Sequence, residues 1–188
     1  MRKDGLNLRG VFPALVTPFE AKTEQVDEEA FRRLIRHALP HVDGVVTSGT
    51  TGEFPYLDRA EQRRLVEIAR EEVEAILRDR PGATVRSRPL VIAGCGGSGT
   101  AQALALAADA REAGADAILV VTPYFLHPSD KEVYQHFYDI AVAVDIPIIL
   151  YNIPQTVDAY LPRQVVEDLA DIPNVVALKD SSGNLTYT

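Results

Sequence analysis

Val175-Val176-Ala177-Leu178-Lys179-Asp180 carries a lysine out of an apolar run, close to the carboxyl end of the 188-residue chain. Four successive apolar residues indicate a buried strand of a parallel sheet. A lysine at the end of such a strand can lose its charge by desolvation, and a neutral amine attacks a carbonyl to form a Schiff base. Lys179 is therefore the first candidate for chemistry, and a surface lysine that ends a strand is the alternative.

Short apolar runs of the same kind alternate with helical patterns along the whole chain. The candidate strands are residues 14–17, 44–47, 90–93, 117–121, 146–151 and 175–179. Apolar residues at helical spacing predict helices within residues 31–38, 65–76 and 133–141. Helix boundaries are indicated by capping residues at Asp27 and Asp58 and by breakers at Pro40, Gly114 and Pro173. Strict alternation of strand and helix predicts a parallel sheet with helical crossovers.

The composition fits one globular domain that works on small molecules. Hydrophobic residues make up 46% of the chain and charged residues 24%, which is enough apolar material for one sizeable core. The net charge of −8 argues against nucleic acid and anionic membranes as partners. A single cysteine, Cys95, excludes an internal disulfide, and residues 1–4 lack the apolar stretch of a secretion signal. We therefore expect a cytoplasmic protein.

The number of repeating units leaves two architectures open. One strand with its helix takes roughly 30 residues, so the chain holds about six units, whereas a closed eightfold barrel takes roughly 250 residues. Five or six strands would suffice for an open doubly wound sheet, and strand count alone favours that fold. Reactive and polar clusters at the carboxyl ends of almost all strands favour the barrel. The polar stretch 78–88 is expected to be a loop within the same domain.

These clusters also carry a family resemblance. They are Thr17-Pro18-Phe19, residues 47–53, residues 94–99, Thr122-Pro123-Tyr124-Phe125, Tyr151-Asn152-Ile153-Pro154 and residues 179–186. From about Gly10 to the final residues, and in family order, they resemble the dihydrodipicolinate synthase and N-acetylneuraminate lyase family. The combination of Gly-Thr-Thr-Gly-Glu, Tyr-Asn-Ile-Pro and Leu-Lys-Asp is specific, although each element alone is weak.

The resemblance implies a fold and a chemistry. The family implies a TIM (β/α)₈ barrel, usually a homotetramer, that performs class I aldolase chemistry on pyruvate or another 2-keto acid. It implies neither a metal nor an organic cofactor. Residues 1–188 are then expected to form a single partial barrel domain with about the first six βα units, lacking the last two.

The resemblance also assigns roles to individual residues. Lys179 corresponds to the Schiff-base lysine, and strand alternation is expected to place it on the same face as Val175 and Ala177. Tyr151 corresponds to the proton relay, for which a buried tyrosine bonded to backbone is the alternative. The predicted substrate-binding residues of the site are Thr50, Thr51, Gly52 and Tyr124. Thr50 and Thr51 would hold the substrate carboxylate at a turn whose amides converge on an anion, and the Thr50 hydroxyl would also pass a proton. An ordinary glycine-threonine turn is the alternative.

Two departures from the family pattern bear on the substrate. The synthase branch usually has a second tyrosine where this chain has Phe125, and an arginine shortly after Tyr-Asn-x-Pro where it has Gln155 and Thr156. Without a bidentate guanidinium, a carboxylated aldehyde is held less well. We therefore expect a lyase that acts on a 2-keto-3-deoxy sugar acid. The alternatives are 4-hydroxy-tetrahydrodipicolinate synthase, which joins pyruvate to aspartate semialdehyde, a 2-keto acid dehydratase, or a non-catalytic truncated homologue.

Other motifs point to different classes of protein. Residues 94–99 satisfy the G-x-G-x-x-G pattern of dinucleotide sites, but the acidic residue near the next strand, Asp116, stands at its beginning rather than its end. His37 and His41 have the spacing of a metal pair, but Pro40 between them favours a helix exit. A non-enzymatic open α/β module is the remaining competitor.

Overall fold

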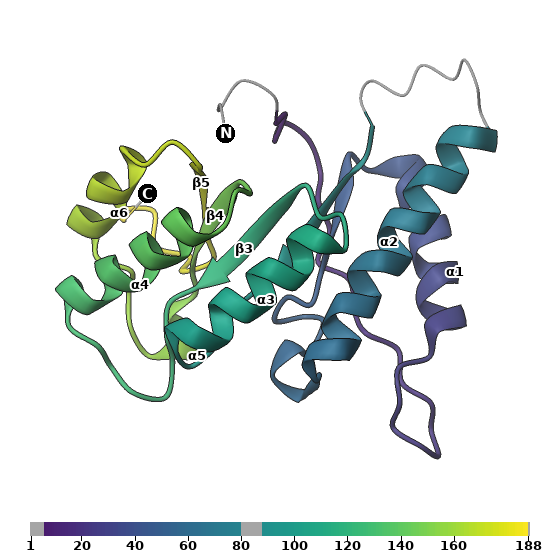
Figure 1. The fold of residues 1–188 in the computed structure, drawn as a ribbon, viewed down its shortest axis with the longest axis horizontal. Helices are drawn as coiled ribbons and strands as arrows, with labels where there is room; N and C mark the ends of the chain where they lie inside the picture. Colours follow the sequence, from purple (N-terminus) through teal and green to yellow (C-terminus); the bar gives the residue numbers. More distant parts are fainter. Residues whose placement is uncertain (1–5, 80–87, 188) are drawn as a thin grey trace.

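The computed structural model describes residues 6–79 and 88–187, which form a five-stranded parallel sheet with helices packed against it (Figure 1). The strands are β1 (Gly44–Thr47), β2 (Leu90–Gly94), β3 (Ala117–Val121), β4 (Ile148–Asn152) and β5 (Val175–Asp180). The helices are α1 (Glu28–Ala38), α2 (Arg59–Asp79), α3 (Thr100–Glu112), α4 (Asp130–Ala143), α5 (Pro154–Val157) and α6 (Arg163–Ala170), with short 3-10 turns η2 (Leu39–His41) and η3 (Phe54–Tyr56). The predicted alternation is confirmed.

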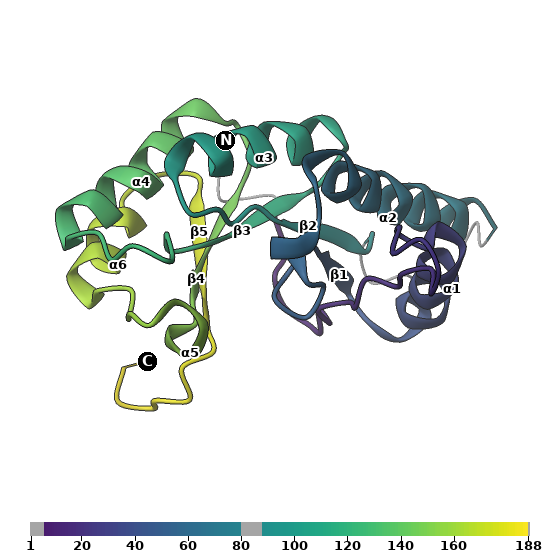
Figure 2. The same ribbon diagram turned by 90° about the horizontal axis from the view of Figure 1, so that it is seen from below.

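The order of the strands decides between the two architectures. The spatial order is β1-β2-β3-β4-β5, the same as the order in sequence, and all four pairings are parallel. A doubly wound sheet reverses its order at a switch point and carries helices on both faces. Here α2, α3 and α4 lie along one side of the sheet (Figure 2). The sheet is therefore an arc of a (β/α) barrel, and the doubly wound alternative is wrong.

Two apolar clusters line the two faces of the sheet. The larger one joins strand residues such as Val45, Val91 and Ile118 to the buried faces of the helices, including Phe31 and Phe137. The smaller one gathers side chains of the other face: Val46, Ile92, Ala117, Leu119, Val121, Ile149, Tyr151 and Val157. Alternation of side chains along each strand thus gives the sheet an inner face and an outer, helix-covered face, and within the described residues no helix layer covers the inner face.

The first predicted strand, residues 14–17, is not one of the five. Ala14 makes a single parallel bridge to Val46 of β1, and the Leu15 amide donates to the Val46 carbonyl at 3.0 Å. Pro13 and Pro18 have no N–H to donate, so a longer ladder cannot form here. The segment lies where the first strand of a barrel is expected, beside β1, but pairs only briefly.

The predicted helix boundaries agree with the structure. Asp27 accepts a hydrogen bond from the Ala30 amide at 2.8 Å, and Asp58 accepts one from the Glu61 amide at 2.8 Å. Pro40 lies in the 3-10 turn that ends α1, and Gly114 has φ +91° just after α3. Helix α2 continues to Asp79, which is further than expected, and residues 80–87 of the predicted loop and residues 1–4 lie outside the described residues.

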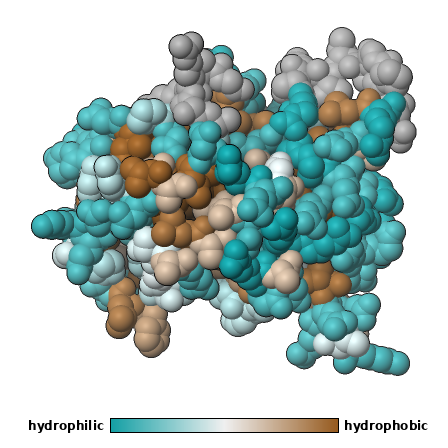
Figure 3. Space-filling view, in the orientation of Figure 1, coloured by the Kyte–Doolittle hydropathy of each residue, from teal (hydrophilic) through white to brown (hydrophobic). Residues whose placement is uncertain are grey.

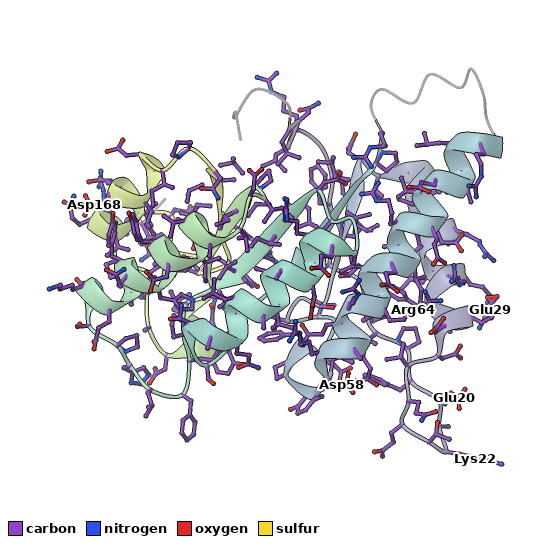
Figure 4. The ribbon with its side chains drawn as sticks, viewed as in Figure 1. Glu20, Lys22, Glu29, Asp58, Arg64 and Asp168 are labelled. Atoms are coloured by element: carbon purple, nitrogen blue, oxygen red, sulfur yellow. The ribbon has the colours of Figure 1, made fainter. Side chains whose placement is uncertain are left out.

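Arginine and glutamate side chains cover the outer surface of α1 and α2. Arg64 of α2 donates to Glu28 of α1 at 2.8 Å and lies between the two helices (Figure 4). Glu72 is almost fully buried and accepts hydrogen bonds from Arg32 at 3.0 Å and Arg36 at 2.7 Å. Hydrophilic residues accordingly dominate this half of the molecular surface in Figure 3. An exposed pair such as Arg64–Glu28 contributes about 0.2–1 kcal/mol, so apolar burial remains the main source of stability.

Candidate active site

Lys179 and Tyr151 are neighbours across two adjacent strands. They are register partners in the β4–β5 pairing, and the Lys179 Nζ lies 4.1 Å from the centre of the Tyr151 ring. Tyr151 is 5% exposed and belongs to the inner-face cluster. An amine above an aromatic face is held by electrostatic attraction when it is charged. The structure thus brings together the two residues predicted to form and protonate a Schiff base.

The predicted alternation along β5 holds for its last residues and is wrong for its first. Ala177 packs against the inner-face cluster and Leu178 against the helix-side cluster, as expected. Val175, which was expected to share the face of Lys179, belongs to the helix-side cluster. The reason is a register shift between Ile148 and Ile149, where β5 carries an extra residue. Such an irregularity moves a side chain to the other face.

A hollow on the inner face leads to the amine. It encloses about 330 Å³ and is lined by Leu8, Phe12, Val46, Ile92, Leu119, Ile149, Ala177, Leu178 and Lys179. Within this lining, Lys179 brings the one charged group to an otherwise apolar surface. The amine is therefore presented to a hollow that an apolar ligand surface could fill.

The loop after β1 is shaped mainly by its own backbone. Ser48 adopts the left-handed region with φ 51°, and Gly52 N–H donates to the Gly49 carbonyl at 3.0 Å. The loop is pressed against β2, because a Cβ at Gly94 would lie 1.9 Å from the Ser48 carbonyl oxygen. The hydroxyl of Thr17 closes the turn by donating to the Gly52 carbonyl at 2.7 Å. A strained conformation held this firmly is typical of a functional loop.

Thr50 and Thr51 lie at the solvent-facing part of this loop, as does Glu53. Both are exposed, and within the described residues their amides donate to no carbonyl or side chain. Unpaired amides at the end of a parallel strand suit a carboxylate. Gly52 differs, because it is buried and its N–H and C=O are both bonded within the chain. Gly52 therefore shapes the turn. Its N–H and C=O are both used there, so the structure offers no backbone group of Gly52 for the predicted contact with a substrate.

A second hollow lies beside Thr50. It encloses about 240 Å³ and is lined by Thr50, Glu53, Phe54, Pro55, Tyr56, Val121, Tyr124, Thr156 and Val157. Tyr124 packs edge-on against Phe54 with ring centres 6.0 Å apart, and burial raises the pKa of its phenol. Val121 is the register partner of Tyr151, so the second hollow borders the Lys179 pair. Thr51 and Gly52 line neither hollow.

Several walls of the second hollow were missed from the sequence. Phe54, Tyr56 and Val157 each stand within a few residues of a recognised motif. Phe54 and Val157 carry no reactive group, and Tyr56 was not part of any motif that the sequence analysis singled out. The signal that could have found them is their position after the ends of β1 and β4, where loops converge. They make this hollow aromatic and apolar.

The positions that depart from the family pattern are accounted for individually. Phe125 has no hydroxyl. It adopts φ 77° and is 88% exposed, so its side chain stands away from the hollow. Gln155 donates to the Ser181 carbonyl at 2.7 Å instead of facing a ligand. Arg163, the next arginine, pairs with Glu167 at 2.9 Å on the exposed side of α6. Thr156 lines the second hollow, and its hydroxyl donates to the Ile153 carbonyl at 3.2 Å.

The competing motifs have structural roles. Asp116 accepts a hydrogen bond from the Val91 amide at 2.8 Å and pairs with Arg70 at 2.5 Å, at the opposite end of β3 from the loops. His37 and His41 lie at the exit of α1 with ring centres 6.3 Å apart. Residues 6–79 and 88–187 contain no group of three or more His, Cys, Asp or Glu side chains that could hold a metal ion. In the same residues, no helix has the length and apolar character to cross a membrane.

Comparison with known proteins places this geometry in context. The sequence profile of the Dihydrodipicolinate synthetase family matches residues 7–188. A 4-hydroxy-tetrahydrodipicolinate synthase of Phenylobacterium zucineum is 42% identical over 178 residues, which cover 94% of this chain and 56% of that protein. The chain therefore spans little more than half the length of such curated relatives.

Solved structures agree in fold. The dihydrodipicolinate synthase of Acinetobacter baumannii in complex with pyruvate superposes with a TM-score of 0.85 at 33% identity, covering 96% of this chain and 58% of that one. CdNal of Clostridium difficile, solved with mannosamine, superposes with a TM-score of 0.84 at 26% identity, covering 97% and 59%. The arc of strands thus corresponds to part of a complete barrel.

Proposed function

The chain belongs to the Dihydrodipicolinate synthetase family, and from that premise we propose that it carries a pyruvate-activating site of the class I aldolase type. The observation that carries the proposal is the pairing of Lys179 with Tyr151 on the apolar inner face, with the Nζ 4.1 Å from the ring centre. The resemblance of Leu178-Lys179-Asp180 to the family motif supports Lys179 as the nucleophile. We also propose that the chain forms a partial barrel domain, assembles as a homo-oligomer and works in the cytoplasm, as the sequence predicts.

The chemistry follows from an amine beside a phenol. The lone pair of the neutral Lys179 Nζ attacks C2 of pyruvate, and the carbonyl oxygen takes a proton to give a carbinolamine. A proton delivered to the carbinolamine hydroxyl lets it leave as water and forms the iminium, and loss of a C3 proton then gives an enamine. The enamine carbon attacks an aldehyde carbon, whose oxygen takes a proton to become a hydroxyl, and the iminium that this step regenerates is hydrolysed by water to the product and the free amine. Tyr151, as a phenol held against the amine, supplies and removes the protons of the dehydration.

The loop after β1 supports the recognition of a 2-keto acid. The unpaired amides of Thr50 and Thr51, together with their hydroxyls, can bind the pyruvate carboxylate and so orient its C2 carbonyl. Thr50 also lines the second hollow, together with Tyr124. From there it can pass a proton during carbinolamine breakdown.

The relatives favour synthesis over cleavage. The sequence alone pointed to a lyase for 2-keto-3-deoxy sugar acids, whereas curated relatives at 38–42% identity carry the name 4-hydroxy-tetrahydrodipicolinate synthase. We therefore propose condensation of pyruvate with an aldehyde, and aspartate semialdehyde is the first acceptor to test. One feature favours the sugar-acid alternative: Glu53 is the single charged side chain among the described residues of the second hollow, and a carboxylate there repels a carboxylated acceptor.

Reductive trapping tests the proposal. The purified chain is incubated with pyruvate and borohydride, and the added mass is located by peptide mass spectrometry. We expect one pyruvate-derived adduct, on Lys179, which is absent in Lys179→Ala. Lys22→Ala is the matched control, because Lys22 lies at the tip of the loop before α1 and points away from the molecule (Figure 4). Modification spread over Lys22 and Lys131, or none at all, contradicts the proposal.

Acceptor assays then separate the two reactions. The yield of the trapped pyruvate adduct is compared with and without aspartate semialdehyde. In a separate reaction, a 2-keto-3-deoxy sugar acid replaces pyruvate. If condensation is the reaction, aspartate semialdehyde consumes pyruvate and lowers the yield of trapped adduct. If cleavage is the reaction, the sugar acid alone produces the same Lys179 adduct without added pyruvate.

A further inference from the structure

A polar brace joins the ends of β4 and β5, one residue beyond the Tyr151–Lys179 pair. Asn152 and Asp180 are register partners, and the Asn152 Nδ2 donates to Asp180 Oδ1 at 2.7 Å. Asn152 has no exposed surface, and its Oδ1 accepts a hydrogen bond from the Leu161 amide at 2.9 Å. A buried amide that uses both its oxygen and its nitrogen in this way fixes the surrounding backbone tightly.

Asp180 extends the brace into the following segment. Its carboxylate accepts from the Ser182 hydroxyl at 2.8 Å and from the Ser182 amide at 3.2 Å, and the Ser181 amide donates to the Asn152 carbonyl at 2.9 Å. Burial alone would raise the pKa of Asp180, but the hydrogen bonds from Asn152 and Ser182 outweigh it, and the pKa is lowered. The carboxylate is therefore charged at neutral pH and holds its donors strongly.

The brace and the reactive pair occupy opposite faces of the same two strand ends. Tyr151 and Lys179 belong to the inner face, and successive residues of a strand point to opposite sides, which places Asn152 and Asp180 on the helix side. The brace can therefore set the offset of the strands without touching a ligand. Such a device matters here, because β4 and β5 already slip by one residue near Ile148.

We propose that Asn152 is a positioning residue, which holds the Tyr151 ring over the Lys179 amine by locking the ends of β4 and β5 in register. The inference rests on the proposed Schiff-base function of Lys179. Reactions that depend on two oriented groups lose about a hundredfold for a displacement of about 1 Å. The hydrogen bond from Asn152 to Asp180 is thus assigned a role in the rate of imine formation in addition to stability.

A reciprocal exchange tests this role. Asn152→Asp sets two carboxylates against each other, while the double variant Asn152→Asp with Asp180→Asn restores one amide donor and one carboxylate in reverse. In Asn152→Asp we expect trapping of pyruvate at Lys179, measured per folded molecule, to slow by about tenfold to a hundredfold. The double variant should recover to within about threefold of the unmodified chain. If Asn152→Asp does not fold, Asp180→Asn is tested alone. It is the milder variant, because it keeps Asn152.

A readout independent of activity accompanies the rates. The protons next to the Lys179 amine lie over an aromatic ring, so their NMR signals should be shifted upfield, lose the shift in Asn152→Asp and regain it in the double variant. A purely structural role predicts lower Tm with the trapping rate per folded molecule and the ring shift unchanged, and that result overturns the inference. Failure of the double variant to recover also overturns it. Absence of any adduct in the unmodified chain, with the ring shift present, rejects the proposed function instead.

Discussion

The two halves of the candidate site are built by different means. The loop at residues 48–53 takes its shape from backbone bonds, from a strained Ser48 and from the absence of a side chain at Gly94. The Tyr151–Lys179 pair depends on side chains, which are aligned by the register of β4 and β5 and locked by Asn152. Under the proposed function, the first half presents main-chain donors to an anion, and the second presents reactive groups to a carbonyl.

The two halves are therefore sensitive to different substitutions. A backbone-built loop tolerates changes of exposed side chains but not an added Cβ at a point of close approach. A pair built from side chains loses its chemistry when one functional group is removed, even if the fold is intact. Substitutions can therefore damage one half and leave the other in place.

The largest separation of the two halves is expected from Tyr151→Phe. This change keeps the ring beneath the Lys179 amine and removes only the hydroxyl. Loss of a general acid–base group costs about 10²–10⁴-fold in rate, so trapping of pyruvate at Lys179 should slow by that factor with little change in Tm. Tyr151→Leu is the companion variant, which removes ring and hydroxyl together. If Tyr151→Phe traps pyruvate at the original rate, the ring rather than the hydroxyl is the functional part.

The loop half is broken by Gly94→Ala. The new Cβ would lie 1.9 Å from the Ser48 carbonyl oxygen, and because that neighbour is backbone, the strand or the loop must move. We expect a destabilisation of about 3 kcal/mol in chemical denaturation. Gly49→Ala is the matched control in the same loop, because its Cβ would meet only the Val46 side chain at 3.8 Å. Equal stabilities for the two variants would show that the loop is not pressed against β2.

A smaller effect comes from the helix layer that supports both halves. His136 of α4 is 3% exposed, bonds to the Thr100 hydroxyl at 2.9 Å, and has its pKa lowered to about 4 by burial. The unfolded chain binds this proton near pH 6.5, so stability is lost as pH falls from about 6.5 towards 4. We expect a loss of about 2 kcal/mol between pH 7 and pH 5.

His136→Asn identifies the source of that loss. The variant cannot take up the proton. Between pH 7 and pH 5, its stability should fall by no more than about 0.5 kcal/mol beyond the loss caused by the other titrating groups. The pKa of the Asp180 carboxylate is lowered, so the brace stays charged throughout this pH range. The loss of stability then comes from the helix layer, and both halves of the site should weaken together. An unchanged slope in His136→Asn assigns the pH dependence to other groups.

Most of the fold could be predicted from local patterns. Apolar runs located all five strands, and caps at Asp27 and Asp58 located two helix starts, because burial and capping act within a few residues. Only the end of helix α3, at Gly114, was predicted. Alanine and leucine occur on all sides of this helix, so its sequence shows no clear apolar stripe. The short pairing of Ala14 and the slip near Ile148 depend on contacts between segments, which periodicity does not report.

The candidate site was predictable to a similar degree. The motifs identified Lys179, Tyr151 and Thr50, and the structure places the first two side by side. Gly52 was assigned a ligand although its backbone groups are used in the turn. The brace at Asn152 was not predicted, because a hydrogen bond across two strands becomes visible only when their register is known.

The central claim is that the loop and the reactive pair act on one ligand, the first holding a carboxylate and the second its ketone. Comparing the borohydride trapping rate of pyruvate with that of its neutral methyl ester tests this claim most directly, with free lysine as the reference for intrinsic reactivity. If the claim holds, pyruvate is trapped on Lys179 at least about tenfold faster than the ester relative to that reference. The preference is lost in Gly94→Ala, which displaces the backbone donors of the loop, and is largely kept when Thr50 and Thr51 are both replaced by valine, which retains their N–H groups. Equal relative rates for pyruvate and ester in the unmodified chain would contradict it.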